Sequence, residues 1–204
     1  MQISTQALAG IKVIELGQLI AGPFAAKKLA DFGADVIKIE PPGEGDPLRK
    51  WRLLHNGTLV WWQVQSRNKK SVALDLRQAE GRDIVRRLIA QADVLVENFK
   101  PGTMEKWGMD YASLSATNPG LIMLRVSGYG QTGPHKDKPG FGVVAEAMGG
   151  LRHLTGAGAR AYARGCFHRR HACQFAWCDR RVARAQSSQQ HEEGGCAQRR
   201  GAGD

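Results

Sequence analysis

A change of composition near Gly156 divides the chain into two unlike parts. Residues 157–204 contain no Leu, Ile, Met or Lys, a single Val, nine Arg, ten Ala and all four Cys of the sequence. A segment needs branched aliphatic side chains to form a hydrophobic core, and this one lacks them. We therefore expect one folded domain in residues 1–156 and a disordered tail over residues 157–204.

The formal net charge of +10 is shared equally between the two parts. Residues 1–156 carry 20 Lys and Arg against 15 Asp and Glu, which gives +5, and the tail carries nine against four, which also gives +5. A mildly basic domain suits a phosphate-bearing ligand. The tail shows no motif of a nucleic-acid-binding module, so we expect no nucleic-acid partner.

The sequence offers no signal for a membrane or for secretion. No apolar run reaches membrane-spanning length, and the first ten residues lack a basic region followed by an apolar stretch. Residues 1–156 contain no Cys, so no disulfide framework supports the fold. We expect a cytoplasmic location and no membrane partner.

Short apolar segments alternate with helical patterns along residues 1–156. Strands are predicted over residues 11–16, 35–40, 71–76, 94–97 and 121–126, and helices from Pro23 to Gly33 and over 79–91 and 141–148. Strands that alternate with helices pair in parallel through right-handed crossovers. The predicted fold class is therefore α/β, with a Rossmann-like parallel sheet and flanking helices.

Four loops lie next to predicted strands, where open α/β sheets bind their ligands. They are QLIAGPF (18–24), SRNKKS (66–71), ENFKPG (97–102) and GYGQTGPHKDKPGFG (128–142). The Ala-Gly-Pro of the first loop presents backbone N–H groups at the start of a helix, which favours an anion. No GxGxxG motif follows the first strand, so a dinucleotide site has little support.

Each loop also has a simpler interpretation. Ala-Gly-Pro is equally compatible with a tight strand-to-helix turn, and Lys69 and Lys70 with a solvated rim. Asn98 and Phe99 fit a turn residue and a core ring. The glycine-rich segment fits a mobile loop without a partner.

The order of these motifs is more specific than any one of them. LAGIKVIELGQLIAGPF, NKKSVALDL, ADVLVENFKPGTMEKWGMDY and NPGLIMLRVSGYGQTGP resemble family III CoA-transferases over residues 8–156. GYGQTGP is more similar to the carboxylic- or dicarboxylic-acid branch than to the formyl-CoA branch. The resemblance implies transfer of CoA from an acyl-CoA donor to a small carboxylic acid, with CoA as substrate and no tightly bound cofactor. Family members form interlocked homodimers, which we do not expect here because their C-terminal half is absent.

The resemblance also assigns CoA-contacting positions. The turn that packs against CoA falls on Ala21 and Gly22, and the other positions fall on Leu74, Arg77, Asn98, Phe99, Lys106 and Lys138. The cations among them suit a polyanionic ligand. Two positions depart from the family: Ile20 stands where Gln is frequent, and Pro41 stands where an Arg is found.

The catalytic aspartate of the family has no in-frame counterpart in this chain. Family members continue with a stretch like RVGVSIGDTLASLHGVIG, whose Asp is the nucleophile. Read one base later, the codons of Ala163–Arg180 permit this whole peptide. We therefore predict that the tail is an out-of-frame translation of the catalytic region and that the chain is inactive, with no catalytic residue of its own.

Three interpretations remain open at this point: a truncated and inactive transferase, a fragment that only binds CoA, and an unrelated α/β nucleotide-binding protein with a zinc-binding tail. The candidate zinc ligands are Cys166, His168, His171, Cys173 and Cys178. Their spacing matches no standard zinc finger, so no metal is expected.

The missing C-terminal half also has an expected consequence for folding. Apolar side chains that it would cover, Trp61 and Trp62 among them, should be exposed and favour aggregation.

Overall fold

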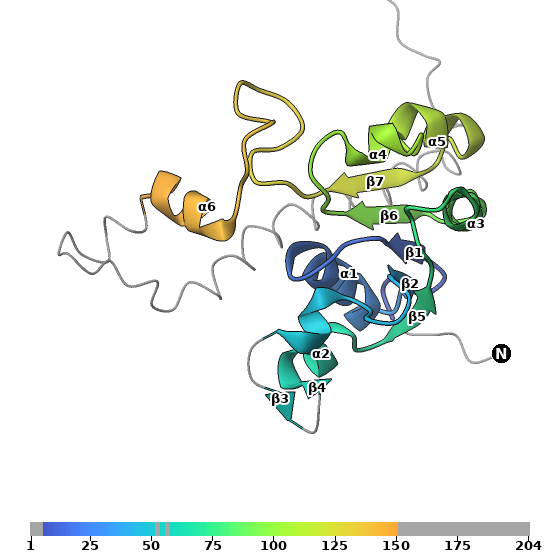
Figure 1. Ribbon diagram of the computed structural model, residues 1–204. Coiled ribbons are helices and arrows are strands. Elements are labelled where there is room, and N and C mark those ends of the chain that lie inside the picture. Colours follow the sequence, from blue (N-terminus) through green and yellow to red (C-terminus); the bar gives the residue numbers. More distant parts are fainter. Residues whose placement is uncertain (1–5, 52–53, 56–57, 151–204) are drawn as a thin grey trace, which may run out of the picture.

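The computed structural model describes residues 6–51, 54–55 and 58–150 (Figure 1). The predicted tail over residues 157–204 and its candidate zinc ligands lie outside the described residues. Among the described residues, every helix is too short or too polar to cross a lipid bilayer.

A five-stranded parallel sheet forms the centre of the domain. Its strands, in spatial order, are β5 (Lys69–Ala73), β2 (Asp35–Glu40), β1 (Lys12–Glu15), β6 (Val94–Glu97) and β7 (Ile122–Arg125). All four pairings are parallel. The chain builds outward from β1 in one direction and then crosses to β6 on the other side, so the order reverses between β1 and β6. This arrangement confirms the predicted α/β class.

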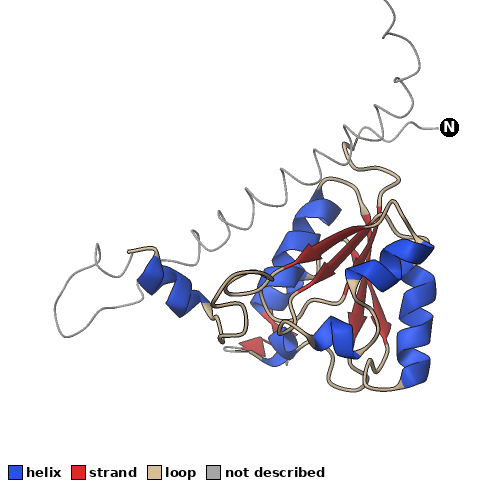
Figure 2. Cartoon of the chain, turned by 90° about the horizontal axis from the view of Figure 1, so that it is seen from above, coloured by secondary structure: helices blue, strands red, loops and turns tan. Residues whose placement is uncertain are grey.

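Helices cover both faces of the sheet (Figure 2). The helices of the described residues are α1 (Ala21–Asp31), α2 (Val60–Gln65), α3 (Ala79–Ile89), α4 (Thr103–Lys106), α5 (Tyr111–Thr117) and α6 (Gly142–Met148). A 3₁₀ turn, η1 (Pro47–Lys50), and a two-stranded hairpin of β3 (Leu54–His55) and β4 (Thr58–Leu59) precede α2.

Alternate residues of the strands supply two separate cores. On the α1 face, Val13, Val36 and Val94 pack against Ala26 and Leu29.

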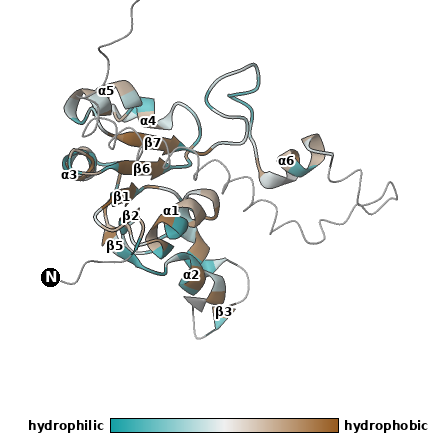
Figure 3. Cartoon of the chain, turned by 180° about the vertical axis from the view of Figure 1, so that it is seen from behind, coloured by the Kyte–Doolittle hydropathy of each residue, from teal (hydrophilic) through white to brown (hydrophobic). Residues whose placement is uncertain are grey.

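On the opposite face, Ile14, Leu95 and Met123 pack against Val85 and Ile89 of α3. Figure 3 shows the hydrophobic character of β6 and β7, which the helices cover. Each fully buried aliphatic side chain contributes about 1.5–3 kcal/mol, so these layers hold the strand ends in place.

Two predicted boundaries are displaced in the structure. The third strand is β5 over Lys69–Ala73 instead of 71–76, and Leu74 ends the pairing by donating its N–H to the Glu40 carbonyl at 2.9 Å. Helix α1 begins at Ala21, two residues before Pro23. Pro23 is tolerated because the first N–H groups of a helix have no intrahelical acceptor.

The expectation that Trp61 and Trp62 are exposed is wrong for Trp62. Only 5% of Trp62 is accessible, because it packs on Leu48 beneath the Arg49 guanidinium, 4.1 Å from the ring centroid. Trp61 is half-buried and stacks on Trp51 with centroids 5.9 Å apart. The segment around η1 and α2 therefore forms a small core of its own.

Helix α6 stands away from the sheet in both views of the ribbon (Figures 1 and 2). Phe141, at its N-terminal boundary, is 72% exposed and Met148 at its end is 66% exposed. The predicted helix over 141–148 is confirmed, and these two apolar side chains at its ends are exposed.

Candidate functional site

The candidate site lies where β1 and β6 end. These neighbouring strands flank the point at which the strand order reverses, and the loops that follow them meet at one edge of the sheet. We call residues 16–20 the β1–α1 loop. In open α/β sheets this crevice is the usual ligand site.

Asn98 fastens the β1–α1 loop to the end of β6. Its side-chain Oδ1 accepts the Gln18 N–H at 2.7 Å, and its Nδ2 donates to the Gln18 carbonyl at 2.9 Å. Both polar ends of the amide are therefore engaged with one backbone unit. Asn98 lies at the predicted edge, where it positions the loop backbone.

Gly22 belongs to the same close contact. A Cβ added at Gly22 would lie 2.7 Å from the Gly17 Cα and 3.2 Å from the Asn98 Oδ1. Only glycine fits at both 17 and 22, because any side chain would push the loop and the helix apart. The Ala-Gly-Pro turn is thus a tight turn with its backbone brought up to Asn98.

Leu19 adopts a left-handed backbone conformation, with φ of 62°. Such a conformation costs a residue with a side chain roughly 1–2 kcal/mol. Hydrogen bonds on both residues stabilise this conformation. The Leu19 N–H donates to the Asp46 Oδ1 at 3.1 Å, and the N–H of the preceding Gln18 donates to Asn98. The loop conformation is set by these side chains, which come from distant segments.

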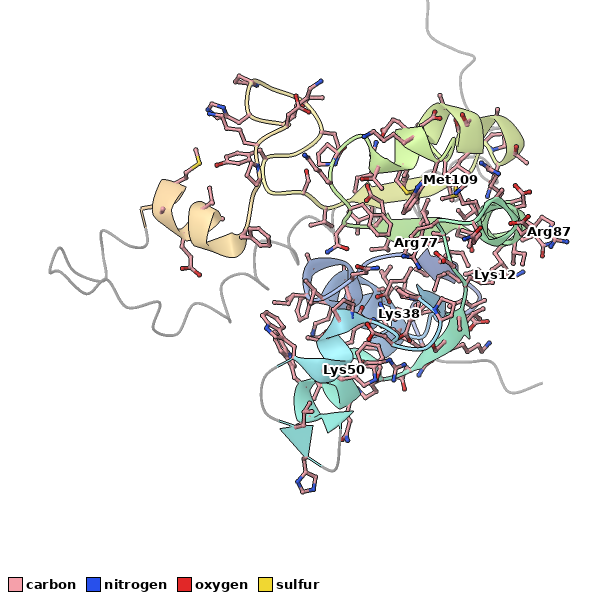
Figure 4. The ribbon with its side chains drawn as sticks, in the orientation of Figure 1. Lys12, Lys38, Lys50, Arg77, Arg87 and Met109 are labelled. Carbon is pink, nitrogen blue, oxygen red and sulfur yellow. The ribbon has the colours of Figure 1, made fainter. Side chains whose placement is uncertain are left out.

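Beneath the loop lies a buried charge cluster, which we define as Glu15, Lys38, Glu40, Asp46, Arg49 and Lys69. Its three carboxylates balance its three cations. In the sheet register Glu15 pairs with Lys38, so their side chains lie on the same face, toward α1. Figure 4 shows Lys38 within the interior of the domain, whereas Arg87 extends outward from α3.

Lys38 is the centre of this cluster. Its ammonium group lies 2.8 Å from Glu15 Oε1, 2.8 Å from Asp46 Oδ2 and 2.7 Å from the Gly17 carbonyl oxygen. Burial lowers the pKa of Lys38, but the two carboxylates outweigh it and leave the pKa above its ordinary value. Lys38 is therefore a charged group that donates to Glu15 and to the Gly17 carbonyl and is ion-paired with Asp46.

Lys69 lies beside it and is ion-paired with the other oxygen of Glu15. Its ammonium group is 2.7 Å from Glu15 Oε2 and 2.7 Å from the Pro23 carbonyl oxygen. Burial lowers the pKa of Lys69 below its ordinary value. The nearby positive charge of Lys38 also lowers this pKa, and the attraction of Glu15 raises it only in part. The interpretation of Lys69 as a solvated rim residue is wrong, since its side chain is only 2% exposed.

Glu40 anchors the outer part of the cluster. Its carboxylate accepts two bonds from the Arg49 guanidinium at 2.7 and 2.9 Å, one from Ser71 at 2.6 Å and one from the Asp46 N–H at 2.8 Å. Burial raises the pKa of Glu40, but these hydrogen bonds more than offset it and lower the pKa to about 2. The loop that carries Asp46 is thereby fixed to β2.

A second ion-paired group closes the other side of the site. Arg125 of β7 donates to Glu97 at 2.7 Å and to Glu105 at 2.6 and 3.2 Å. Glu97 also accepts the Phe99 N–H at 2.7 Å. Burial raises the pKa of Glu97, which these hydrogen bonds only partly counter. This group orients the backbone that leads from β6 into α4.

Four of the predicted CoA-contacting residues lie along this edge. Ala21 and Gly22 open α1, and Asn98 and Phe99 follow β6. The Phe99 ring makes an edge contact with Trp107, with centroids 5.2 Å apart, and packs against the α3-side core.

The remaining predicted residues lie farther out. Leu74 and Arg77 follow the edge strand β5, and Leu74 is half-buried. Arg77 is exposed and paired with Asp75 at 2.9 Å. Lys106 and Lys138 are both exposed. A contact of any of these residues with CoA remains a prediction.

Lys138 belongs to a loop whose two ends are in contact. A Cβ added at Gly128 would lie 2.3 Å from the Gly140 Cα, so the two ends of the glycine-rich segment touch. Within the loop the Tyr129 and His135 rings make an edge contact, with centroids 5.7 Å apart. The segment is therefore a compact loop that presents its lysines to solvent.

The chemistry of this edge favours binding an anion. The N–H groups of Ala21 and Gly22 lie in the first turn of α1, where no intrahelical acceptor exists, and no side chain within the described residues caps this helix start. Glu15, Asp46 and Glu97 are each ion-paired to a lysine or arginine. Within the same described part of the chain, no group of three or more His, Cys, Asp or Glu side chains is arranged to hold a metal ion.

Sequence reasoning missed the buried charge cluster. A signal was present, because Glu15 and Lys38 each follow two aliphatic residues of a strand, at positions that face the same way. Opposite charges at paired positions of adjacent buried strands are expected to meet, since unpaired buried charges are costly. Asp46 gave no such signal, because a loop of glycines and prolines carries it.

The model of CoA-transferase family III matches residues 8–167. Succinyl-CoA–D-citramalate CoA-transferase from Chloroflexus aurantiacus is 57% identical over 150 residues, which cover 73% of this chain and 37% of that protein. Human succinyl-CoA:glutarate CoA-transferase is 41% identical over 150 residues, which cover 73% of this chain and 34% of that protein. The chain thus spans little more than a third of the length of these relatives.

Solved structures share the fold. A CAIB/BAIF family protein from Brucella suis superposes with a TM-score of 0.78 at 38% identity, over 95% of this chain and 52% of that one. Rv3272 from Mycobacterium tuberculosis superposes with a TM-score of 0.64 at 38% identity, over 72% of this chain and 41% of that one.

Proposed function

The chain belongs to CoA-transferase family III, and from this premise we propose that residues 1–156 are the N-terminal part of an enzyme that moves CoA from an acyl-CoA donor to a carboxylic acid. One observation carries the proposal: the family match extends over the parallel sheet, and the β1–α1 loop and the loop after β6, which carry two of the ordered motifs, lie at its carboxyl edge.

In this proposal the β1–α1 loop and the start of α1 receive CoA. Ala21 and Gly22 lie against the ligand with N–H groups that have no intrahelical acceptor, and Phe99 offers an apolar ring beside the pantetheine or adenine end. Arg77, Lys106 and Lys138 are exposed cations farther out that suit the phosphates. Asn98 acts through the loop backbone, because its amide is already used by Gln18.

For the whole enzyme we propose succinyl-CoA as donor and a dicarboxylic acid as acceptor. The relatives described above are a succinyl-CoA–D-citramalate and a succinyl-CoA:glutarate CoA-transferase. The GYGQTGP segment, which resembles the carboxylic- or dicarboxylic-acid branch, supports the same substrate class.

The proposed reaction uses the aspartate of the family. Its carboxylate oxygen attacks the acyl-CoA carbonyl and the C–S bond breaks. CoA departs as its thiolate, and the aspartate and the acyl group form a mixed anhydride. The thiolate then attacks the aspartyl carbonyl, so the donor acid departs as its carboxylate and an aspartyl-CoA thioester remains. The acceptor carboxylate then attacks the aspartyl-CoA thioester, which expels CoA thiolate and forms a second mixed anhydride. The thiolate attacks the acceptor carbonyl of this anhydride, which gives the new acyl-CoA and frees the aspartate.

We propose that this chain binds CoA weakly and does not transfer it. The aspartate belongs to a stretch that the codons of residues 163–180 permit only when they are read one base later. Loss of the nucleophile in a covalent mechanism removes many orders of magnitude in rate. Binding is retained in part, because the first loops of the site are present in frame.

The test compares the chain with a variant whose reading frame is restored at the join near codons 155–160. Each is incubated with succinyl-CoA and a series of dicarboxylates, and the new acyl-CoA is measured by chromatography. We expect transfer by the restored protein and none by the present chain. Transfer by the present chain contradicts the inactivity, and no transfer by the restored protein with any acid contradicts the enzyme class.

A further inference from the structure

We propose that Lys38 and Lys69 are positioning residues for CoA binding, because they hold the carbonyl oxygens of Gly17 and Pro23 toward the protein interior and so fix the backbone between them. The inference rests on the proposed function, since CoA is the ligand of that backbone.

The two lysines reach the loop from different strands. Lys38 lies in the middle of β2 and meets the Gly17 carbonyl at 2.7 Å, and Lys69 begins β5 and meets the Pro23 carbonyl at 2.7 Å. Glu15 joins them, since each of its two oxygens contacts one ammonium group. One carboxylate thus ties both lysines to the strand from which the loop departs.

The two carbonyls bracket the segment that would face the ligand. Between them Asn98 holds both backbone groups of Gln18, and Asp46 holds the Leu19 N–H. Every residue from 17 to 19 is therefore fixed by a side chain of another segment. Because the Gly17 and Pro23 carbonyls point toward the interior, the N–H groups of Ala21 and Gly22 at the start of α1 can face a ligand.

The burial of these charges is costly, which argues against a role in stability alone. Replacing a buried ion pair by apolar residues of similar size is often neutral or stabilising. Lys38 is 1% exposed and the Lys69 side chain 2% exposed, so both ammonium groups are fully desolvated. A cluster of this kind is better explained by the backbone conformation that it imposes.

The chain offers a control that lacks the loop contact. Lys27 of α1 is also buried, at 5% exposure, and is ion-paired with Asp31, one turn away. Lys27→Met removes a buried lysine and an ion pair without touching residues 16–20. Lys69→Met removes the bond to the Pro23 carbonyl and keeps most of the side-chain volume.

The experiment is a titration of the ¹⁵N-labelled full chain with CoA to millimolar concentration, followed through the amide resonances of Ala21 and Gly22. We expect CoA to shift both in the unaltered chain. In Lys69→Met both resonances should already be displaced without CoA, and the Kd should rise by about tenfold or more, which corresponds to about 1.4 kcal/mol. Lys27→Met should leave the Kd and both resonances unchanged.

The outcomes separate the two proposals. If CoA shifts neither resonance in the unaltered chain, the CoA site and this inference both fail. If the unaltered chain binds CoA and Lys69→Met binds it equally well, the inference alone fails. Should Lys69→Met not fold, Lys69→Arg decides, because it keeps the charge beside Glu15 but cannot place a compact ammonium group at the Pro23 carbonyl. An unchanged Kd in that variant overturns the inference.

Discussion

Gly17 and Gly22 face each other across the β1–α1 loop so closely that a Cβ on either would lie 2.7 Å from the Cα of the other. The contact joins the end of β1 to the first turn of α1, and the Asn98 Oδ1 lies 3.2 Å from both added positions. The end of β1, the first turn of α1 and the side chain of the distant Asn98 therefore meet directly. The proposed CoA loop depends on this contact for its shape.

Gly22→Ala should destabilise the domain and weaken CoA binding. The new methyl group meets backbone atoms that cannot rotate away, so we expect a loss of about 1–3 kcal/mol in the free energy of unfolding. Gly120→Ala is the control, since its Cβ would meet only the Asn118 Oδ1 at 3.8 Å. Denaturant unfolding measures both variants, and equal stability in the two would contradict the steric argument.

Asn98→Asp should lower both stability and CoA affinity. The change replaces the Nδ2 donor by an oxygen that faces the Gln18 carbonyl, which costs about 1–3 kcal/mol.

Asn118→Asp provides the comparison. Its Nδ2 donates to the Ile89 and Ala92 carbonyls at 3.0 and 2.7 Å, near the opposite end of the sheet. It should lose similar stability and keep its affinity for CoA, as measured by titration. A parallel loss of affinity in both variants would show that Asn98 acts only through global stability.

Stability should fall in acid because of Glu40. Its pKa in the folded protein is about 2, against an ordinary value of 4.5, so the unfolded chain takes up the proton first. The stabilisation is complete above pH 4.5 and is lost as the pH falls toward 2. The shift corresponds to roughly 3 kcal/mol. Urea midpoints measured between pH 6 and pH 2.5 report the loss.

Glu40→Gln isolates this contribution. The variant has no proton to take up at this position, so its stability should fall less over the same pH range. Its stability at pH 6 should already be lower, because the Arg49 pair has lost its charge partner. Curves that run parallel for the two proteins would assign the acid sensitivity to other carboxyl groups.

The nucleotide sequence tests the origin of the tail. Between the codons of Phe167 and Arg180, a reading displaced by one base should encode a peptide like SIGDTLASLHGVIG without a stop codon. The aspartate requires an Arg170 codon that ends in A. Resequencing the gene across codons 150–185 decides this, and any other third base at Arg170 rules out the displaced reading.

The strand and helix pattern of residues 1–156 could be predicted because it depends on local periodicity. Apolar runs such as Ile11–Leu16 and Asp35–Glu40 contain the observed strands β1 and β2, and the amphipathic pattern over 79–91 contains α3. Short elements such as α4 and α5 were missed, since four to seven residues carry too little periodicity. The family resemblance came from ordered motifs, which are also a property of the sequence alone.

The sequence by itself determined the parallel α/β fold, the family and the composition break near Gly156. Tertiary structure alone decided the roles of Lys69, Asp46 and Asn98. Each lies far along the chain from the residue it bonds, so no local pattern links Lys69 to Pro23 or Asn98 to Gln18. The physical reason is that a charge or amide is costly to bury unless it is paired or hydrogen-bonded, so its role depends on its partners. Only the packed sheet brings those partners together.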